Sequence, residues 1–592
     1  MLLCISLTLT GCFEKSEGDP YYGNVTPPRT QEFRWSDGGL PQTFDPALAA
    51  APPDTDAVRA LFEGLTDYDP RTLAPVPGVA FRWESSKDLR EWTFYLRRDA
   101  RWSNGDTVTA GDFVRSWQRT LDFGSRAPHA RLFENIVGSS PADRTASIEP
   151  PTGALQQVRR TNEKNGAQRL LKKDTKPAEQ AISFGAEAIS DEVLRVRLQR
   201  PDKDFAGLVS HPIFRPVHIV KDDNVGAALT EPIVSNGPFK LTQVAGDGVI
   251  LDRDGRYWDA QTVFLNRVRF VATSNAEEAL EKYRLGDVDA VTNAGFEPLA
   301  LKLLAPYKDF RRATFGALTF YRFNTAHAPF DDPRVREALA IAVDRDRISD
   351  DEMDGASEPA KTFLPVNSSD KRSEKNESGD AISDDIARAR RLLGEAGYPN
   401  GVGFPIVRLL VNRNEQQRTI AQAVTMMWRR LLGIESEIVV KTWDEYEEAM
   451  RLGDYDVVRK GTVMQTMDEA ANMRAMFEPD GTIEPVDDST PDSISPKAAA
   501  SNVSKEKLAL TNTGDGQAAS PQGGQPVLSQ AEALKQLPAI PIYFSSSFSL
   551  VRPYVLGFDS NLLDAPSLKR VRLDTSWKPP SRKLSTWFRI GG

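Results

Sequence analysis

Residues 92–119 have the sequence WTFYLRRDARWSNGDTVTAGDFVRSWQR, in which the spacing of the bulky side chains changes once. Bulky and polar residues alternate from Trp92 to Arg97, as they do in a strand with one buried face. A turn follows at 100–106, and Thr109 then stands where a hydroxyl caps the start of a helix. The stretch therefore predicts a strand, a turn and a helix in close succession.

The chain as a whole has the composition of a large globular protein. Its 592 residues exceed one ordinary hydrophobic core, so two or more domains are expected. It is 40% hydrophobic and 27% charged, with a formal net charge of −9, and this acidic balance argues against nucleic acid as a partner. No run of about 18 apolar residues occurs, so the pattern predicts no membrane-spanning segment.

The second half of the chain alternates helical and strand patterns. Asp332 and Pro333 suit the cap and first position of a helix, and Val407–Asn412 has the pattern of a strand. Apolar residues at helical spacing then run from Ile420 to a stop at Gly433. This alternation favours an α/β layer architecture with a mixed sheet.

The stretch 92–119 resembles the extracellular solute-binding proteins of oligopeptide and dipeptide ABC importers, bacterial solute-binding protein family 5. This resemblance implies an α/β, two-lobed periplasmic-binding-protein fold with mixed sheets, of the large three-domain variety. Further strings carry it in the same order along the chain: EGLTDYDP at 63–70, PGVAFRWE at 77–84, SNGPF at 235–239, LGDVD at 285–289 and FDDPRVREALA at 330–340.

The resemblance also implies a division of the chain. The base domain of lobe 1 is expected in three pieces, an extra domain of lobe 1 at 63–205 and lobe 2 at 321–545. The three pieces of the base domain are 31–62, 206–320 and 546–592. Two segments interrupt the family's pattern: 138–180 is a basic insertion, more readily a solvated excursion than a membrane contact, and 480–529 has a composition that predicts disorder.

The first 12 residues, MLLCISLTLTGC, are predicted to be a lipoprotein signal peptide. Their end resembles a lipobox, which makes Cys12 the lipidated residue and 13–30 a tether to the outside of a membrane. Since the only other cysteine is Cys4, no internal disulfide is expected. A wrongly assigned start or an uncleaved stub is the alternative, because the apolar run is short and no Lys or Arg precedes it.

The stretch 441–469, KTWDEYEEAMRLGDYDVVRKGTVMQTMDE, is the candidate ligand site. Its pattern predicts a helix that ends at Gly453 and a strand over Tyr455–Gly461. The strand ends with a cation, Arg459, beside a glycine that lets a ligand approach the backbone. The simpler alternative is that Arg459 is a structural ion-pair partner.

Residue by residue, the resemblance places ligand contacts at Trp443, Arg459, Gly461, Asn412 and Gln417. Three positions depart from the family. Gln417 stands where a relative has a histidine near the peptide's carboxylate end. Thr462 replaces a tryptophan, and Gln465 replaces the aspartate that receives a peptide's α-ammonium group; a neutral amide does not offset a buried ammonium. Asp468 could substitute for that aspartate only in a rebuilt loop.

No enzyme motif occurs, and none of the four histidines has a cysteine near it, so neither a catalytic nor a metal site nor a cofactor is predicted. The resemblance implies the substrate-binding component of an ABC importer. Such a protein is expected to capture peptides or peptide-like solutes between its lobes as a monomer and to deliver them to a permease with its ATPase subunits. The alternative is a non-transport binding or scaffold protein that keeps the fold and has lost the pocket.

Overall fold

The structure is a computed structural model, and it describes residues 20–139, 183–218, 228–229, 232–365, 381–477 and 529–579. The signal peptide with Cys12, residues 13–19 of the tether, nearly all of the insertion 138–180 and nearly all of the segment 480–529 lie outside the described residues. Among the residues that are described, no helix is long and apolar enough to cross a membrane.

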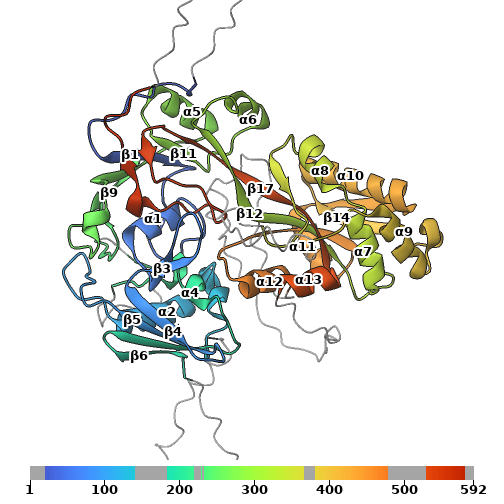
Figure 1. Cartoon of the computed structure of the whole chain (residues 1–592), viewed down its shortest axis with the longest axis horizontal. Coiled ribbons are helices and arrows are strands. Elements are labelled where there is room, and N and C mark those ends of the chain that lie inside the picture. Colours follow the sequence, from blue (N-terminus) through green and yellow to red (C-terminus); the bar gives the residue numbers. More distant parts are fainter. Residues whose placement is uncertain are drawn as a thin grey trace, which may run out of the picture.

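One mixed sheet runs through both lobes (Figure 1). It contains parallel pairs in each lobe and antiparallel pairs between them. Its strand order is β15 (Ser436–Lys441), β14 (Val407–Asn412), β16 (Val457–Val463), β12 (Phe310–Phe323), β17 (Ala539–Val551), β11 (Ala290–Thr292), β1 (Glu32–Asp37), β10 (Arg267–Val271), β9 (Gly248–Arg253) and β8 (Phe239–Ala245), with β13 (Ser357–Pro359) paired to β17. The two-lobed α/β fold with mixed sheets is confirmed.

β12 and β17 are the long strands that pass from one lobe to the other (Figure 1). They pair along their whole length, but the register breaks between Thr314 and Leu318. At this break the amide of Gly316 donates to the carbonyl of Leu562 at 2.7 Å, and the carbonyl of Gly316 accepts from the amide of Met464 at 2.8 Å. The break is the natural place for a hinge between the lobes.

The extra domain predicted at 63–205 contains a four-stranded antiparallel sheet with α2 (Ala110–Asp122) packed against it. Its strand order is β4 (Ala80–Ser85), β5 (Glu91–Leu96), β7 (Val193–Arg197) and β6 (Ala186–Ser190). Thr109 forms a capping box with Asp112 at the start of α2. The strand, turn and helix predicted for 92–119 are confirmed; the domain boundaries stay a prediction.

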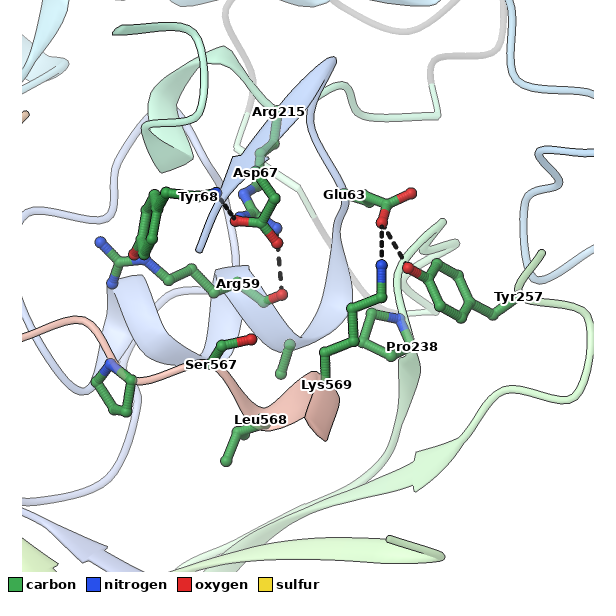
Figure 2. Close-up of a pocket in the computed structure, with 12 residues that line it drawn as sticks. Arg59, Glu63, Asp67, Tyr68, Arg215, Pro238, Tyr257, Ser567, Leu568 and Lys569 are labelled. Carbon is green, nitrogen blue, oxygen red and sulfur yellow. Dashed lines mark hydrogen bonds and ion pairs between the residues drawn. The ribbon is translucent and has the colours of Figure 1, made fainter. Parts of the chain in front are cut away.

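A network of paired charges joins α1 (Asp54–Leu61) to the C-terminal part of lobe 1 (Figure 2). The carboxylate of Glu63 accepts from the hydroxyl of Tyr257 at 2.5 Å and from Nζ of Lys569 at 3.1 Å. Arg215 contacts Asp67 at 3.4 Å. The pocket between these side chains holds about 20 Å³, which is room for one water molecule. The network is therefore a structural ion cluster, too small for a solute.

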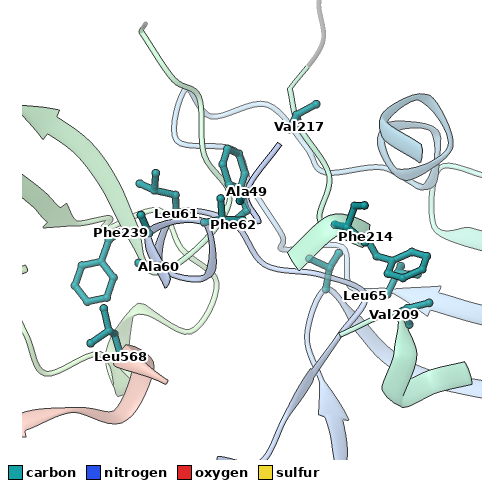
Figure 3. Close-up of a cluster of buried hydrophobic side chains, with 14 of the residues drawn as sticks. Ala49, Ala60, Leu61, Phe62, Leu65, Val209, Phe214, Val217, Phe239 and Leu568 are labelled. Atoms are coloured by element: carbon teal, nitrogen blue, oxygen red, sulfur yellow. The ribbon is translucent and has the colours of Figure 1, made fainter. Parts of the chain in front are cut away.

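The main hydrophobic core lies around α1 and is continuous from the base of lobe 1 into the extra domain. In Figure 3, Phe239 and Leu568 lie on one side of α1, and Leu65 and Phe214 lie on the other. Burial of such side chains contributes about 25 cal/mol per Å² of apolar surface. Because these residues come from distant parts of the chain, the core forms only when all the pieces of lobe 1 are in place.

Lobe 2 packs helices on both faces of its sheet. On one face α10 (Glu415–Leu432) lies with α7 (Pro333–Ile341) and α9 (Ile386–Glu395), and Trp428 donates its Nε1–H to the carbonyl of Leu339 at 3.0 Å. On the other face lies α11 (Trp443–Leu452). The remaining helices and strands are α4 (Phe205–Leu208), α5 (Ala276–Leu285), α6 (Pro298–Leu304), α8 (Arg345–Arg347), α12 (Glu469–Phe477), α13 (Gln530–Gln536), β2 (Thr66–Tyr68), β3 (Pro75–Pro77), β18 (Val555–Leu556) and β19 (Arg572–Leu573).

The local predictions for lobe 2 are confirmed with one shift. Val407–Asn412 is a strand with the predicted bounds, and left-handed glycines end α10 and α11 at Gly433 and Gly453. The strand predicted at Tyr455–Gly461 lies at Val457–Val463 instead. It extends further because its last residues pair with β12, a partner that a local pattern does not reveal.

A pair of glycine substitutions tests how α10 ends. Gly433 has φ of +73°, and a Cβ there would lie 2.3 Å from the carbonyl oxygen of Asn400, whereas a Cβ on Gly394, inside α9, would have no heavy atom within 4 Å. We expect Gly433→Ala to lower the free energy of unfolding by about 2 kcal/mol or more and Gly394→Ala to raise it by up to about 1 kcal/mol. Urea unfolding measures both. Equal effects of the two variants would contradict this account.

Candidate functional site

The carboxyl ends of three parallel strands meet at one edge of lobe 2. β14 is followed by α10 and then by β15 on one side, whereas β15 is followed by α11 and then by β16 on the other side of β14. The chain thus reverses its winding between β14 and β16, with helices on opposite faces. In open α/β sheets, ligands bind outside the carboxyl ends of the strands at such a point.

Arg459 and Gln417 lie together at this edge. Arg459 is 3% exposed and pairs across the sheet with Tyr321 of β12, and the hydroxyl of Tyr446 donates to its backbone carbonyl. Gln417 is in the first turn of α10, on the same face of the sheet, and its Nε2 donates to the hydroxyl of Tyr543 at 3.0 Å. The site therefore combines a buried cation with an amide and two tyrosines.

The polar atoms of this edge retain hydrogen-bonding capacity. Burial raises the pKa of Tyr321, Tyr543 raises it further, and Arg459 opposes both. Within the part of the chain that the structure describes, the hydroxyl of Tyr321 and Oδ1 of Asn412 are buried without a hydrogen-bond partner. Buried polar groups are nearly always paired, so these atoms mark a place where a further group can bind.

The other predicted residues of this stretch flank the edge. Trp443 begins α11 on the opposite face of the sheet and stacks on Tyr446 with ring centroids 5.5 Å apart. Gly461 pairs with Thr319 of β12, next to the hinge. The structure thus brings Arg459, Gln417, Asn412 and Gly461 to one edge and places Trp443 behind it; their role in binding stays a prediction.

Gln465 lies apart from this group. It hydrogen-bonds His211 of lobe 1, and burial lowers the pKa of His211 well below its ordinary value, with His129 adding to the effect. The rings of the two histidines are 4.9 Å apart. The amide of Gln465 therefore lies beside a neutral imidazole.

Asp468 lies in a different set of contacts from Gln465, and its substitution for that aspartate stays a prediction. Its Oδ1 accepts from the amide of Ala471 at 2.8 Å, at the start of α12, and its carboxyl group lies beside Asp202 of lobe 1. Burial raises the pKa of Asp468 to about 7, and Asp202 raises it next. This carboxyl group belongs to a different cluster.

Lobe 1 carries carboxyl groups where its own parallel strands end. Asp37 ends β1 and accepts from the hydroxyl of Thr292 at 2.6 Å and from Nδ2 of Asn293 at 2.7 Å. Asp564 accepts from the hydroxyl of Ser547 on β17 at 2.8 Å. Burial raises the pKa of both carboxyl groups, that of Asp564 to about 6. Arg59 lines the small pocket beside α1 (Figure 2) and lowers the pKa of both carboxyl groups, in opposition to burial.

The tyrosines of the lobe 2 edge were not predicted from the sequence. Tyr321 and Tyr543 stand in apolar strand patterns, and an apolar strand pattern predicts core residues. Only the pairing of β12 with β16 and β17 puts them beside Arg459 and Gln417. A polar atom inside a strand that is buried on both faces is the signal that could have singled them out.

Comparisons with known proteins agree on one family. The model of the bacterial extracellular solute-binding proteins, family 5 Middle, matches residues 74–483. The periplasmic oligopeptide-binding protein OppA of Escherichia coli is 27% identical over 90% of this chain and 91% of its own length. OppA of Salmonella typhimurium is 30% identical over 72% of this chain and 73% of its own length. The unliganded open form of MppA, a periplasmic murein tripeptide-binding protein, has a similar fold, with a TM-score of 0.68 and 24% identity. The match covers 93% of this chain and 98% of that chain.

The unpaired hydroxyl of Tyr321 gives a prediction on stability. A buried hydroxyl without a partner costs about 1–3 kcal/mol, so Tyr321→Phe should leave the free energy of unfolding unchanged or raise it by up to about 1 kcal/mol. Urea unfolding without added solute measures this. Gln417→Leu is the matched control, because it breaks the bond to Tyr543 and should destabilise the protein. A clear loss of stability in Tyr321→Phe would mean that the hydroxyl is already paired.

The raised pKa of Asp564 gives a prediction on pH. A carboxyl group whose pKa is higher in the folded state stabilises the protein below its ordinary pKa of 3.8, and this stability is lost as the pH rises through about 6. Asp564→Asn should therefore reduce the loss of unfolding free energy between about pH 5 and pH 7.5 by about 1.4 kcal/mol, the part of the full effect that falls in this pH range. Asn tolerates the φ of +47° at this position.

Asp350→Asn, at an exposed position, is the control for the pH prediction. Denaturant unfolding of the wild type and of both variants at about pH 5 and pH 7.5 measures the change in the free energy of unfolding. If Asp564→Asn follows the wild-type curve as closely as Asp350→Asn does, Asp564 is not the titrating group.

Proposed function

Because the chain belongs to the bacterial extracellular solute-binding proteins of family 5, we propose that it is the substrate-binding component of an ABC importer and captures peptides or peptide-like solutes. The observation that carries the proposal is the edge of β14 and β16, where Arg459, Gln417 and two tyrosines meet beside Gly461. A buried cation next to an open backbone suits a ligand with carbonyl or carboxylate groups along an extended chain.

Capture would use the hinge in β12 and β17. A ligand that contacts both lobes shifts the protein toward a closed state only as far as it binds that state more tightly. The register break between Thr314 and Leu318 lets the lobes move, while the pairing on either side keeps each lobe rigid. The edge that carries Arg459 is attached directly to β12, so it moves with lobe 2.

In this proposal each group of the edge has a separate task. Arg459 receives a carboxylate or carbonyl group of the ligand, and Gln417 with Asn412 offers amide hydrogen bonds. Gly461 admits the ligand backbone next to the strand. Trp443 acts less directly, since it supports the backbone of β16 through Tyr446.

The pair of Gln465 and His211 shapes the ligand preference. Both groups are neutral, so they cannot compensate the charge of a free α-ammonium group at that place. Peptides whose amino end is blocked, or whose ammonium group stays in water, therefore suit this protein as well as free peptides do.

The setting follows from the same proposal. The protein would work outside the cytoplasmic membrane as a monomer, held there by a lipid on Cys12, and would pass its solute to a permease with ATPase subunits. It performs no catalysis and needs no cofactor in this role. The relatives named above are periplasmic peptide-binding proteins, which supports the location and the solute class.

Binding to peptides tests the proposal. Peptides of two to five residues, each with a free and with an acetylated amino end, should include ligands that raise the melting temperature. At a hundredfold excess over Kd, a ligand stabilises the folded state by about 2.7 kcal/mol. The acetylated and free forms should bind within about threefold of each other, because the groups proposed to meet that end, Gln465 and His211, are both neutral. Calorimetry gives the two Kd values.

Arg459→Lys and Arg459→Ala should weaken a ligand found in this way by about 10- to 100-fold, the range of one hydrogen bond to a charged group. Arg430→Ala, at the exposed far end of α10, is the control and should bind normally. No shift with any peptide, in protein that circular dichroism shows to be folded, would reject the transport role and favour a scaffold that keeps only the fold.

A further inference from the structure

Three carboxyl groups from two distant parts of the chain lie close together. Asp202 and Asp204 lie in lobe 1 between β7 and α4, and Asp468 lies in lobe 2 between β16 and α12. One oxygen of each lies within 4.8 Å of the others. Asp202 is 5% exposed and Asp468 is 1% exposed, so two of the three are almost fully buried.

Two carboxylate oxygens of this cluster accept no hydrogen bond from a donor among the residues described. Oδ1 of Asp202 accepts from the amide of Asp204 at 2.8 Å, and Oδ1 of Asp468 accepts from the amide of Ala471 at 2.8 Å. The second oxygens of Asp202 and Asp468 are buried, lie close to each other, and accept from no donor among the residues described. Leaving buried acceptors unpaired is costly, so these oxygens indicate a missing ligand.

The charges nearby do not balance. Among the residues described, the acidic groups are the three aspartates and Glu469, and the basic groups that reach them are Lys203 and Arg474. Lys203 is 3.8 Å from Asp204 and 3.6 Å from Glu469, but its side chain is 67% exposed. When all four carboxyl groups are ionised, they exceed the two cations by two negative charges, which is the charge that one divalent cation neutralises.

We propose that Asp202, Asp204 and Asp468 bind one divalent cation of the calcium type. Hard cations prefer carboxylate oxygens, and Ca²⁺ accepts six to eight oxygen ligands in irregular geometry, with water completing the shell. Mg²⁺ demands a near-ideal octahedron, which carboxylates from two separate segments suit less well. A site with three carboxylates in an extracytoplasmic protein should have a Kd of about 10⁻⁴ to 10⁻³ M.

The cation would tie the segment after β16 to lobe 1. Met464 in this segment bonds the hinge residue Gly316, and Met467 packs in a cluster with Tyr68 and Leu73 of the extra domain. The same segment continues the strand that carries Arg459. Cation binding therefore stiffens the connection between the lobe 2 edge and lobe 1, whether or not the solute is a peptide.

Calcium titration of the full chain tests the site. Protein treated with a chelator and dialysed should show a saturable rise in melting temperature between about 0.1 and 10 mM CaCl₂ at constant ionic strength, with one site by calorimetry and a weaker response to MgCl₂. Asp468→Asn should melt at a higher temperature than the wild type without calcium, because it removes a buried charge, and should bind calcium at least tenfold more weakly.

Two further variants make the result decisive. Asp99→Asn, at an exposed position in the same domain, removes the same charge and should keep the full calcium response. Asp204→Asn serves in place of Asp468→Asn if that variant does not fold, and it too should lose at least tenfold in calcium affinity. A wild-type protein that shows no calcium response, or an equal loss of response in Asp99→Asn, would overturn the proposal. The aspartates would then share only a proton.

Discussion

The pairing of β12 with β17 is the interaction on which the rest of the molecule depends. Backbone donors and acceptors that leave water must find partners, and these two strands supply them across the whole width of the protein. β16 pairs with β12 in lobe 2, and β11 pairs with β17 in lobe 1. The lobes are therefore two halves of one hydrogen-bonded sheet, and any site between them is positioned by that sheet rather than by loops.

The candidate ligand edge shows how strictly the register acts. Side chains alternate between the faces of a strand, so a slip of one residue between β12 and β16 would turn Arg459 to the face covered by α11. Its partners would be lost as well, because Tyr321 and Tyr543 come from the two hinge strands and Gln417 from α10. The site therefore forms only when the sheet forms, and a change in strand pairing would remove it entirely.

Much of the fold could be predicted because its signals are local. Thr109 caps α2, Gly433 and Gly453 end their helices, and Val407–Asn412 is a strand, all as the residue patterns predict. The end of β16 was missed because its pairing with β12 decides it. Of the candidate site, Arg459 and Gly461 stood out as a cation and a glycine at a strand end. The tyrosines beside them, and the meeting of Asp202 with Asp468, depend on contacts between residues far apart in sequence, which no spacing encodes.

Gly316 shows how the joint between the lobes is restrained. Its amide and carbonyl are both engaged, by Leu562 and Met464, and a Cβ on this residue would lie 2.9 Å from the carbonyl oxygen of Leu562. The joint therefore has a third line of attachment beside the two long strands. Two strands that cross side by side allow the lobes to twist as well as bend. The attachment through Gly316, which lies beside these strands, resists twisting. A side chain at this glycine would press on the carbonyl of Leu562 and so weaken the third attachment.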